Sequence, residues 1–239
     1  MNKPIIGVVS KHYATYKSNK KDTFIRDEVK QAIFDNGGVA IGILPTEANI
    51  NYCGDVWKDS LSIEEKENLI AQLNLCDGLI LQGGEETDNY ESIIAKYCYE
   101  NDVPILGICA GQNNIARALG GTTYKIHNPE KHDKSFEEYV HSIDIDKSSK
   151  FYEIVETDKM QVNSRHKRTI KECPNLDKVA FCEDGYPDVI ESKNKTFYIG
   201  VRFHPESLYK IDKNHNRIFE AFINACKIRR NYGINRNYQ

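Results

Sequence analysis

The stretch Pro104–Gly121, PILGICAGQNNIARALGG, places one cysteine between an apolar strand pattern and a helical pattern. Its first five residues suit a buried parallel strand, and its second half carries apolar side chains at helical spacing. Gly107 and Gly111 stand two residues before and two residues after Cys109. Glycines at these positions allow the sharp strand-to-helix turn that presents a nucleophile at the edge of an α/β sheet. The stretch therefore predicts such an elbow, with the Cys109 thiol raised above the sheet.

The predicted position of Cys109 at a helix N-terminus bears on its chemistry. Unpaired N–H groups and the positive end of the helix dipole stabilise a thiolate there, which lowers the pKa of a thiol. The N–H of Ala110 would point to where an oxyanion forms during attack on a carbonyl. The alternative is a core cysteine, since free cysteines are commonly buried. The strand-turn-helix context favours the functional interpretation.

Strand and helix patterns alternate over the first half of the chain, which predicts a mostly parallel central sheet flanked by helices. The expected strands are 4–10, 39–44, 77–82 and 104–108, with a polar loop after the first. The expected helices are 24–36, one opened by a Ser62–Glu65 capping box, and one capped by Asp88 or Asn89. Beyond residue 121 the expected strands are 122–126, 139–145, 159–163, 179–183, 189–192 and 196–203, with helices at 148–155 and 213–230. The sequence thus predicts an α/β fold with an added antiparallel β region in the C-terminal half, in a single domain over residues 1–239.

The composition is that of an ordinary globular protein, with 239 residues, 28% charged residues and a formal net charge of −3. Such a chain has no basic field to recruit nucleic acid. No apolar run approaches the roughly 18 residues that span a membrane, and the apolar part of the N-terminus is short for a signal peptide. Seven scattered cysteines without a Cys-x-x-Cys pair argue against a disulfide framework and a zinc site, and for the cytoplasm. His127, His132 and Asp133 have loosely metal-like spacing, but we expect surface loop residues there.

A nucleophilic cysteine needs a base, and the base needs a group that orients it. Of the seven histidines, His204 ends the expected strand 196–203 and is followed by Pro205 and Glu206. Proline favours an extended backbone at the preceding residue, and residues two apart in an extended chain point the same way. The Glu206 carboxylate can therefore reach the His204 imidazole and stabilise its charged form. The alternative, a solvated strand-end turn, is disfavoured by the Cys109 elbow in the same chain.

Two further segments have both a functional and a structural interpretation. Gly83-Gly84 follows the strand 77–82 and is expected at the same sheet edge as Cys109. Its N–H groups either supply a second oxyanion donor or form a plain strand-to-helix turn. The segment Asn163-Ser164-Arg165-His166 either contacts substrate or builds Asx and Ser/Thr turns.

The chain resembles class I glutamine amidotransferases, whose fold is flavodoxin-like. The resemblance is carried by GICAG at 107–111, the Gly-Gly loop at 83–84 and GVRFHPE at 200–206. More closely, the chain is similar to the gamma-glutamyl-gamma-aminobutyrate hydrolase family, a branch of the gamma-glutamyl hydrolases on that fold. The features shared with that branch are ALGGT-x-Y at 118–124, the strand starting at His141, VNS-x-H at 162–166 and the Asp184-Gly185 turn. The likeness extends over essentially the whole chain.

The resemblance implies roles for individual residues. Cys109 would be the nucleophile, His204 the base and Glu206 the orienting acid, with an oxyanion hole formed by Ala110 and the loop of Gly83 and Gly84. The residues expected to bind substrate are Gln112, Asn113, Asn163, Ser164 and His166. The chain departs from the family at Asn113, where Gln is usual, at Ala110, where a basic residue is common, and at Lys167-Arg168, where His-Gln is usual. The loop after Gly84 reads EETDNY and lacks the usual proline. These departures concern specificity more than the chemistry.

The function implied by the resemblance is that of a cytoplasmic hydrolase. It would cleave the amide of a small γ-glutamyl substrate through a thioester on Cys109, without metal, cofactor, nucleic acid or membrane. Whether the protein forms a homodimer is left open. One alternative is a glutaminase subunit that delivers ammonia to a separate synthetase. A second alternative is a non-catalytic binding or sensor protein on the same fold, against which the intact Cys109, His204 and Glu206 speak.

Overall fold

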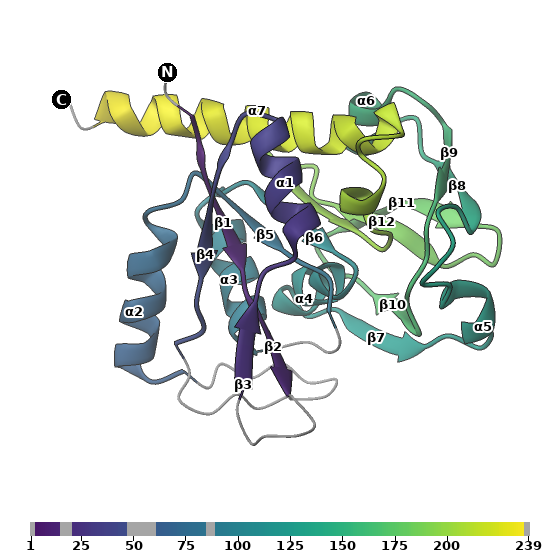
Figure 1. The fold of residues 1–239 in the computed structure, drawn as a ribbon, viewed down its shortest axis with the longest axis horizontal. Coiled ribbons are helices and arrows are strands. Elements are labelled where there is room, and N and C mark those ends of the chain that lie inside the picture. Colours follow the sequence, from purple (N-terminus) through teal and green to yellow (C-terminus); the bar gives the residue numbers. More distant parts are fainter. Residues whose placement is uncertain (1–2, 15–20, 47–60, 85–88, 237–239) are drawn as a thin grey trace.

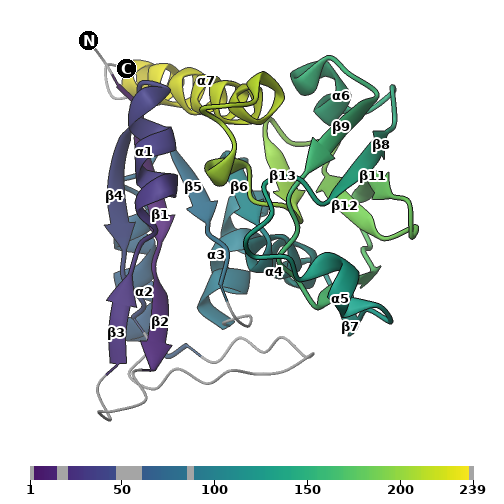
Figure 2. The same ribbon diagram turned by 45° about the vertical axis from the view of Figure 1, so that its right-hand side comes forward.

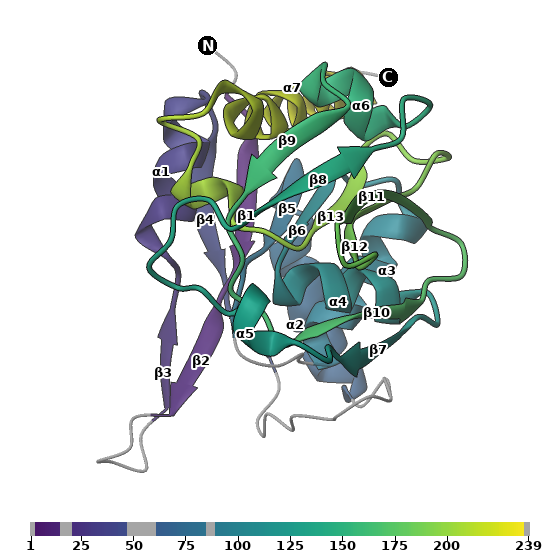
Figure 3. The same cartoon turned by 90° about the vertical axis from the view of Figure 1, so that its right-hand side faces the viewer.

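The computed structural model describes residues 3–14, 21–46, 61–84 and 89–236. Within these residues nine strands form one sheet in the order β4-β1-β5-β6-β13-β12-β11-β8-β9 (Figure 1). The parallel strands are β4 (Val39–Ile43), β1 (Ile5–Val9), β5 (Gly78–Leu81), β6 (Ile105–Ile108) and β13 (Tyr198–Val201). The antiparallel strands are β12 (Pro187–Glu191), β11 (Asp177–Cys182), β8 (His141–Ile145) and β9 (Lys159–Val162). The structure confirms the predicted α/β class with an antiparallel addition in the C-terminal half. In Figure 3 the antiparallel strands β8 and β9 face the viewer.

Two layers of helices cover the sheet, because its parallel strands are apolar on both faces. Along β1, for example, Ile6 and Val8 belong to one buried cluster and Val9 belongs to the other. The first cluster lies under α1 (Asp27–Asp35), α6 (Lys150–Val155) and α7 (Lys213–Arg236), and the second under α2 (Ile63–Leu73), α3 (Asn89–Glu100) and α4 (Ala110–Ala118) (Figures 1 and 2). The predicted capping box opens α2, where Ser62 accepts from Glu65 N at 3.2 Å and Glu65 accepts from Ser62 N at 2.8 Å. No helix in the described part of the chain combines the length and apolarity needed to cross a membrane.

The structure differs from the sequence prediction in several short elements. Lys11–Ala14 (β2) and Lys21–Phe24 (β3) form an antiparallel hairpin where the sequence predicts a polar loop, so α1 begins later than expected. The hairpin rests on backbone pairing, which a polar, lysine-rich sequence does not reveal. The elements without a sequence prediction are α5 (Pro129–His132), β10 (Arg168–Glu172), which pairs with β7 (Thr122–Lys125), and the short 3-10 helix η1 (Pro205–Ser207). Asp88, one of two predicted caps of α3, lies outside the described residues.

The strand order brings three chain segments to one edge of the sheet. β6 is hydrogen-bonded to β5 on one side and to β13 on the other, all three in parallel. The residues that follow these strands at their carboxyl ends therefore lie side by side, as ligand sites do in open α/β sheets. They are Gly83 after β5, Cys109 after β6 and His204 after β13.

Candidate active site

Cys109 occupies the turn between β6 and α4, with φ 52° and ψ −102°. This is a backbone conformation that residues other than glycine rarely adopt, so the turn is strained. Two hydrogen bonds hold it, from Cys109 N to Val201 O at 2.8 Å and from Gln112 N to Cys109 O at 3.1 Å. Gly111 permits the close approach of α4 to β5, because a Cβ at this position would lie 2.2 Å from Leu81 O. The local geometry is that of a nucleophile elbow.

His204 and Glu206 meet Cys109 at this edge of the sheet. His204 Nδ1 and Glu206 Oε1 are 2.7 Å apart, and the His204 imidazole lies close enough to the Cys109 thiol for each group to shift the pKa of the other. Because Nδ1 is used by the carboxylate, Nε2 is the nitrogen available to the sulfur. The three residues are 7%, 5% and 2% exposed in the order Cys109, His204 and Glu206, so their interactions are shielded from bulk water.

The surroundings of the Cys109–His204 pair favour a thiolate beside an imidazolium. Burial by itself raises the pKa of Cys109, but the charge of His204, its hydrogen bond and the charge of Arg202 outweigh burial and lower that pKa. Burial opposes the charge on His204 as well, yet Glu206 and the Cys109 thiolate together raise the pKa of the imidazole. Cys76 and Cys173 have no adjacent imidazolium, and burial raises their pKa to about 12.

The predicted oxyanion donors lie on both sides of Cys109. Ala110 is the first residue of α4, where backbone N–H groups have no partner within the helix. On the other side, Gly83 approaches so closely that a Cβ on it would lie 3.4 Å from Cys109 Cβ and 2.6 Å from His204 Cε1. A side chain at position 83 would collide with the imidazole, so the loop needs glycine there. Its backbone therefore lies directly beside Cys109 and His204.

The residues expected to bind substrate are divided between the cavity and the interior. Asn113 and His166 line a cavity of about 620 Å³ next to Cys109, but Gln112, Asn163 and Ser164 are buried away from its lining. The Gln112 amide donates to Asp188 O at 3.1 Å and to Gly200 O at 3.3 Å. These bonds hold the Gln112 side chain against the backbone of β12 and β13, away from the cavity.

Asn163 is bonded to the backbone of His204. Its Oδ1 accepts from His204 N at 2.7 Å, and its Nδ2 donates to His204 O at 2.9 Å. The side chain is fully buried, so it serves the position of His204 and does not face the cavity.

The cavity has a strongly cationic wall that the sequence prediction assigned only in part, through the segment 163–166 and the departure at Lys167-Arg168, and without Arg26 or Arg202. The basic residues of the wall, besides His166 and His204, are Arg26, Arg165, Lys167, Arg168 and Arg202. The acidic side chain among the described lining residues is that of Asp133, which pairs with Lys167 at 3.1 Å. Arg202 is 1% exposed and donates to Cys109 O at 3.3 Å and to Asn113 Oδ1 at 2.7 Å. Arg202 stands two residues before His204 in the extended chain directly after β13, and this spacing is the signal that puts both side chains on the same face, since side chains alternate along an extended chain.

The loop at Gly84 packs against a buried ion pair between Lys11 and Glu91. Lys11 Nζ lies 2.5 Å from Glu91 Oε1, with the two side chains 4% and 0% exposed. Asn114 of α4 also donates to Glu91. A Cβ on Gly84 would lie 3.1 Å from Lys11 Cε, so the lysine packs directly against the glycine loop. The ion pair thereby ties β2, α3 and α4 to the segment beside Cys109.

The histidine segment 127–133 is only partly at the surface. His127 is exposed and Asp133 is half-buried, but His132 is 3% exposed, so the prediction of a surface residue is wrong for His132. The ring of His132 packs against those of His141, His166 and Tyr186, with centroids 5.2 to 5.4 Å apart. The sequence does not reveal this burial because the three partner rings come from other segments of the fold, with His166 and Tyr186 far from His132 in the chain.

Comparison with known proteins gives this geometry a context. The Peptidase C26 family matches residues 85–206. A CTP synthase from Chlamydia muridarum is 28% identical over 194 residues, which cover 68% of this chain and 36% of that protein, so the match spans little more than a third of such relatives. A glutamine amidotransferase-like protein from Lactococcus lactis is 28% identical over 193 residues, covering 69% of this chain and 80% of the relative.

Solved structures share the fold along nearly the whole chain. The structure of a protein described as one of the subunits of GMP synthase, from Thermoplasma acidophilum, has a TM-score of 0.67 at 17% identity, covering 98% of this chain and 99% of that chain. A glutamine amidotransferase structure from Thermotoga maritima has a TM-score of 0.57 at 14% identity, covering 96% and 99%. These solved structures show the fold, while the Peptidase C26 match and the glutamine amidotransferase-like relatives support a hydrolase or amidotransferase of the cysteine type acting on amide bonds. The chain belongs to the Peptidase C26 family, within the class I glutamine amidotransferase-like superfamily.

Proposed function

We propose that this protein hydrolyses the γ-amide of a small γ-glutamyl compound through a thioester on Cys109. The observation that carries the proposal is the buried Cys109–His204–Glu206 arrangement at the floor of a cationic cavity. A thiolate is a strong nucleophile toward a carbonyl carbon, and an adjacent imidazolium is the acid that an amine leaving group needs.

The proposed reaction has two steps, acylation and deacylation of Cys109, and both use His204 and Glu206. The Cys109 thiolate attacks the amide carbon, and the resulting oxyanion accepts hydrogen bonds from backbone N–H groups at Ala110 and in the Gly83-Gly84 loop. His204 gives its proton to the departing nitrogen, the C–N bond breaks, and a thioester remains. Neutral His204 then takes a proton from water as the water attacks the thioester, which releases glutamate and restores the thiolate and the imidazolium. Glu206 holds the ring and stabilises its charged form in both steps.

The cationic wall supports a substrate whose amine half carries a carboxylate. The charges of Asp133 and Lys167 cancel in their ion pair. The net positive charge of the wall therefore comes from Arg26, Arg165, Arg168 and Arg202. Arginine binds carboxylates in a bidentate manner, and the glutamyl part of the substrate has one α-carboxylate to offer. The excess of arginines accommodates a second carboxylate, as in γ-glutamyl-γ-aminobutyrate.

A matched substrate pair tests this proposal. γ-Glutamyl-γ-aminobutyrate and γ-glutamylbutylamine share the scissile bond and the carbon chain and differ in the terminal carboxylate. We expect the purified protein alone to release glutamate from both, with kcat/KM at least tenfold higher for the carboxylated compound, and Cys109→Ala to abolish both reactions. Equal kcat/KM values would contradict the carboxylate preference. No turnover of either compound, with no covalent labelling of Cys109 by a glutamine-like chloroketone, would favour the non-catalytic alternative.

A second candidate function is a glutaminase that serves a separate synthetase. It is favoured by the CTP synthase relatives, in which the region similar to this chain makes up 36% of the protein. On this account the remaining part of such an enzyme would be supplied by another chain. Chloroketone labelling of Cys109, together with turnover of glutamine that appears only when a synthetase chain is added, would favour this candidate.

A further inference from the structure

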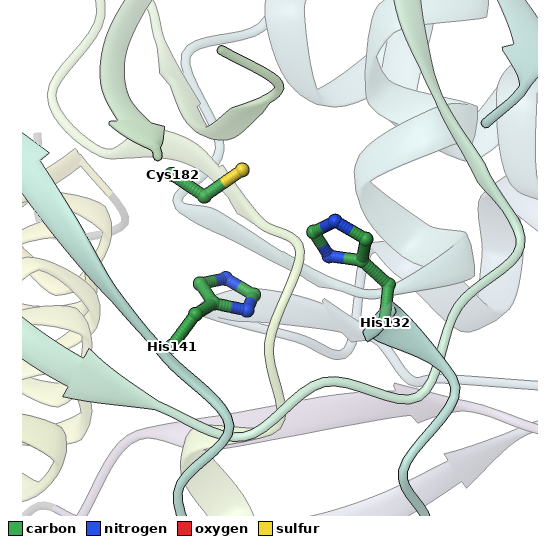
Figure 4. A group of neighbouring side chains, drawn as sticks. All are labelled: His132, His141 and Cys182. Atoms are coloured by element: carbon green, nitrogen blue, oxygen red, sulfur yellow. The ribbon is translucent and has the colours of Figure 1, made fainter. Parts of the chain in front are cut away.

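Two histidines and one cysteine converge near the cavity, outside the proposed catalytic arrangement. His132 ends α5, His141 begins β8 and Cys182 ends β11. One donor atom from each of the three side chains lies within 4.8 Å of the others. Figure 4 shows the two imidazole rings next to each other, with the sulfur of Cys182 pointing toward them.

The register of the sheet explains why His141 and Cys182 meet. Cys182 lies opposite Ile143 in the antiparallel ladder between β11 and β8. Residues directly opposite each other point to the same face, and so do residues two apart on one strand. His141 and Cys182 are therefore on one face, and α5 brings His132 over that face from outside the sheet.

Each histidine has a carboxylate at one ring nitrogen, and its other ring nitrogen is buried without a hydrogen-bond partner among the described residues. His132 Nε2 is 3.2 Å from Asp184 Oδ2, and His141 Nε2 is 3.0 Å from Asp188 Oδ2. The Nδ1 atoms of both rings are buried and have no hydrogen-bond partner among the described residues. A carboxylate on one ring nitrogen is the usual support for a metal-binding histidine, because it fixes the tautomer and makes the other nitrogen more basic. The His132 side chain is 97% buried, so leaving Nδ1 unpaired there costs free energy that a cation would recover.

We propose that His132, His141 and Cys182 bind one zinc ion. Two imidazoles and one thiolate are a ligand set that favours Zn²⁺ over Mg²⁺ or Ca²⁺, which prefer oxygen. Tetrahedral zinc with Zn–N near 2.0 Å and Zn–S near 2.3 Å needs donor atoms roughly 3.4 to 3.6 Å apart, so an approach of at most about 1.4 Å brings the three protein donors into place, with water as the fourth ligand. On binding, the Cys182 thiol forms the Zn–S bond and releases its proton to solvent. The nearby carboxylates of Asp184 and Asp188 offset the charge of the ion.

The ion would fasten the wall of the catalytic cavity to the antiparallel half of the sheet. His166 N donates to His132 O at 3.1 Å, and Lys134 N donates to Ser164 O at 2.9 Å. These bonds join the segment after α5 to the loop that carries Arg165 and His166 into the cavity. The zinc site would therefore stiffen that wall without taking part in the chemistry at Cys109.

Metal titration of the full chain tests the proposal without any activity assay. We expect chelator-treated protein to bind one equivalent of Zn²⁺, and Co²⁺ to give a sulfur-to-metal charge-transfer band. Cys182→Ser should remove that band, and Cys182→Ser or His141→Asn should weaken zinc binding at least tenfold. Asp188→Asn, which alters the partner of His141, should weaken it by about 10- to 100-fold.

Matched controls identify the site. Cys173→Ser, Cys109→Ser and His127→Asn should bind zinc as the unmodified protein does, and far-ultraviolet circular dichroism checks that each variant is folded. A variant-free measurement follows the alkylation of each cysteine by mass spectrometry, in which Zn²⁺ should protect Cys182 but not Cys173. Absence of stoichiometric binding, a charge-transfer band that persists in Cys182→Ser or disappears in Cys109→Ser, or alkylation of Cys182 that ignores Zn²⁺ would each overturn the proposal.

Discussion

The side chain of Asn163 is hydrogen-bonded to both backbone groups of His204, accepting from its N–H at 2.7 Å and donating to its C=O at 2.9 Å. Asn163 follows β9 in the antiparallel half of the sheet and His204 follows β13 in the parallel half, and the contact is fully buried. The position of the imidazole relative to Cys109 thus depends on an amide that never reaches the cavity.

The variant Asn163→Ala tests this positioning role. Loss of both hydrogen bonds lets the His204 backbone shift, and a misplacement of about 1 Å at a catalytic group can lower the rate by roughly 100-fold. We expect kcat for γ-glutamyl-γ-aminobutyrate to fall by about 10- to 100-fold with little change in KM. Asn163→Asp keeps the acceptor for His204 N–H and should recover part of the rate. A rise in KM at constant kcat would instead indicate that Asn163 contacts substrate.

Glu206→Gln should change the pH dependence of the reaction. Acylation needs protonated His204, and Glu206 helps to raise the pKa of that imidazole above its ordinary value. The reaction in the unmodified protein should therefore persist to alkaline pH and decline as the imidazolium loses its proton. Removing the carboxylate charge lowers the pKa of His204, so the alkaline limb of kcat/KM moves to lower pH and the maximal rate drops by about 100-fold or more. An alkaline limb at the same pH in both proteins would show that Glu206 does not stabilise the imidazolium.

The buried Lys11–Glu91 ion pair predicts a large loss of stability in Lys11→Met. Removing one partner leaves the other charge buried, which typically costs about 3–5 kcal/mol. We expect a decrease of this order in the free energy of unfolding measured with urea. The matched control is Lys96→Met, which removes an exposed lysine that lies 3.9 Å from Glu100 and should change stability by less than about 1 kcal/mol. Equal effects of the two substitutions would contradict a special role for the buried pair.

Arg165→Gln examines the cationic wall. A charge-assisted hydrogen bond contributes about 1.5–3 kcal/mol, so KM for γ-glutamyl-γ-aminobutyrate should rise roughly tenfold or more, while KM for γ-glutamylbutylamine changes little. Lys171→Gln makes the same change of charge at an exposed lysine outside this cavity and serves as the control. If both substrates lose affinity equally, Arg165 does not recognise the second carboxylate.

The parts of the site that the sequence predicts are those fixed by local backbone geometry. The two glycines around Cys109 dictate a turn whatever surrounds it, and the spacing of His204 and Glu206 lets their side chains meet, as the 2.7 Å contact records. The roles of Gln112 and Asn163 are less accessible. Both carry amides that suit substrate or backbone equally, and only the packing of α4 and β9 decides which of the two they meet.

Long-range contacts account for the remaining differences. The hairpin of β2 and β3 depends on backbone pairing between polar segments, which hydrophobic periodicity does not register. The His132–His141–Cys182 cluster likewise draws on residues from three elements, so no spacing rule for metal ligands detects it. Arg202 is an intermediate case, because strand alternation places it beside His204 but gives no indication of its function.

The backbone of Cys109 has a consequence for the evolution of this fold. A non-glycine residue with φ 52° is held in a conformation that costs of order 1–3 kcal/mol, and the hydrogen bonds of Cys109 N and Cys109 O sustain it. Replacement of the nucleophile by glycine would release that cost, so loss of activity and gain of stability are available in a single step. A variant that keeps the scaffold but loses the proposed nucleophile is therefore a single substitution away.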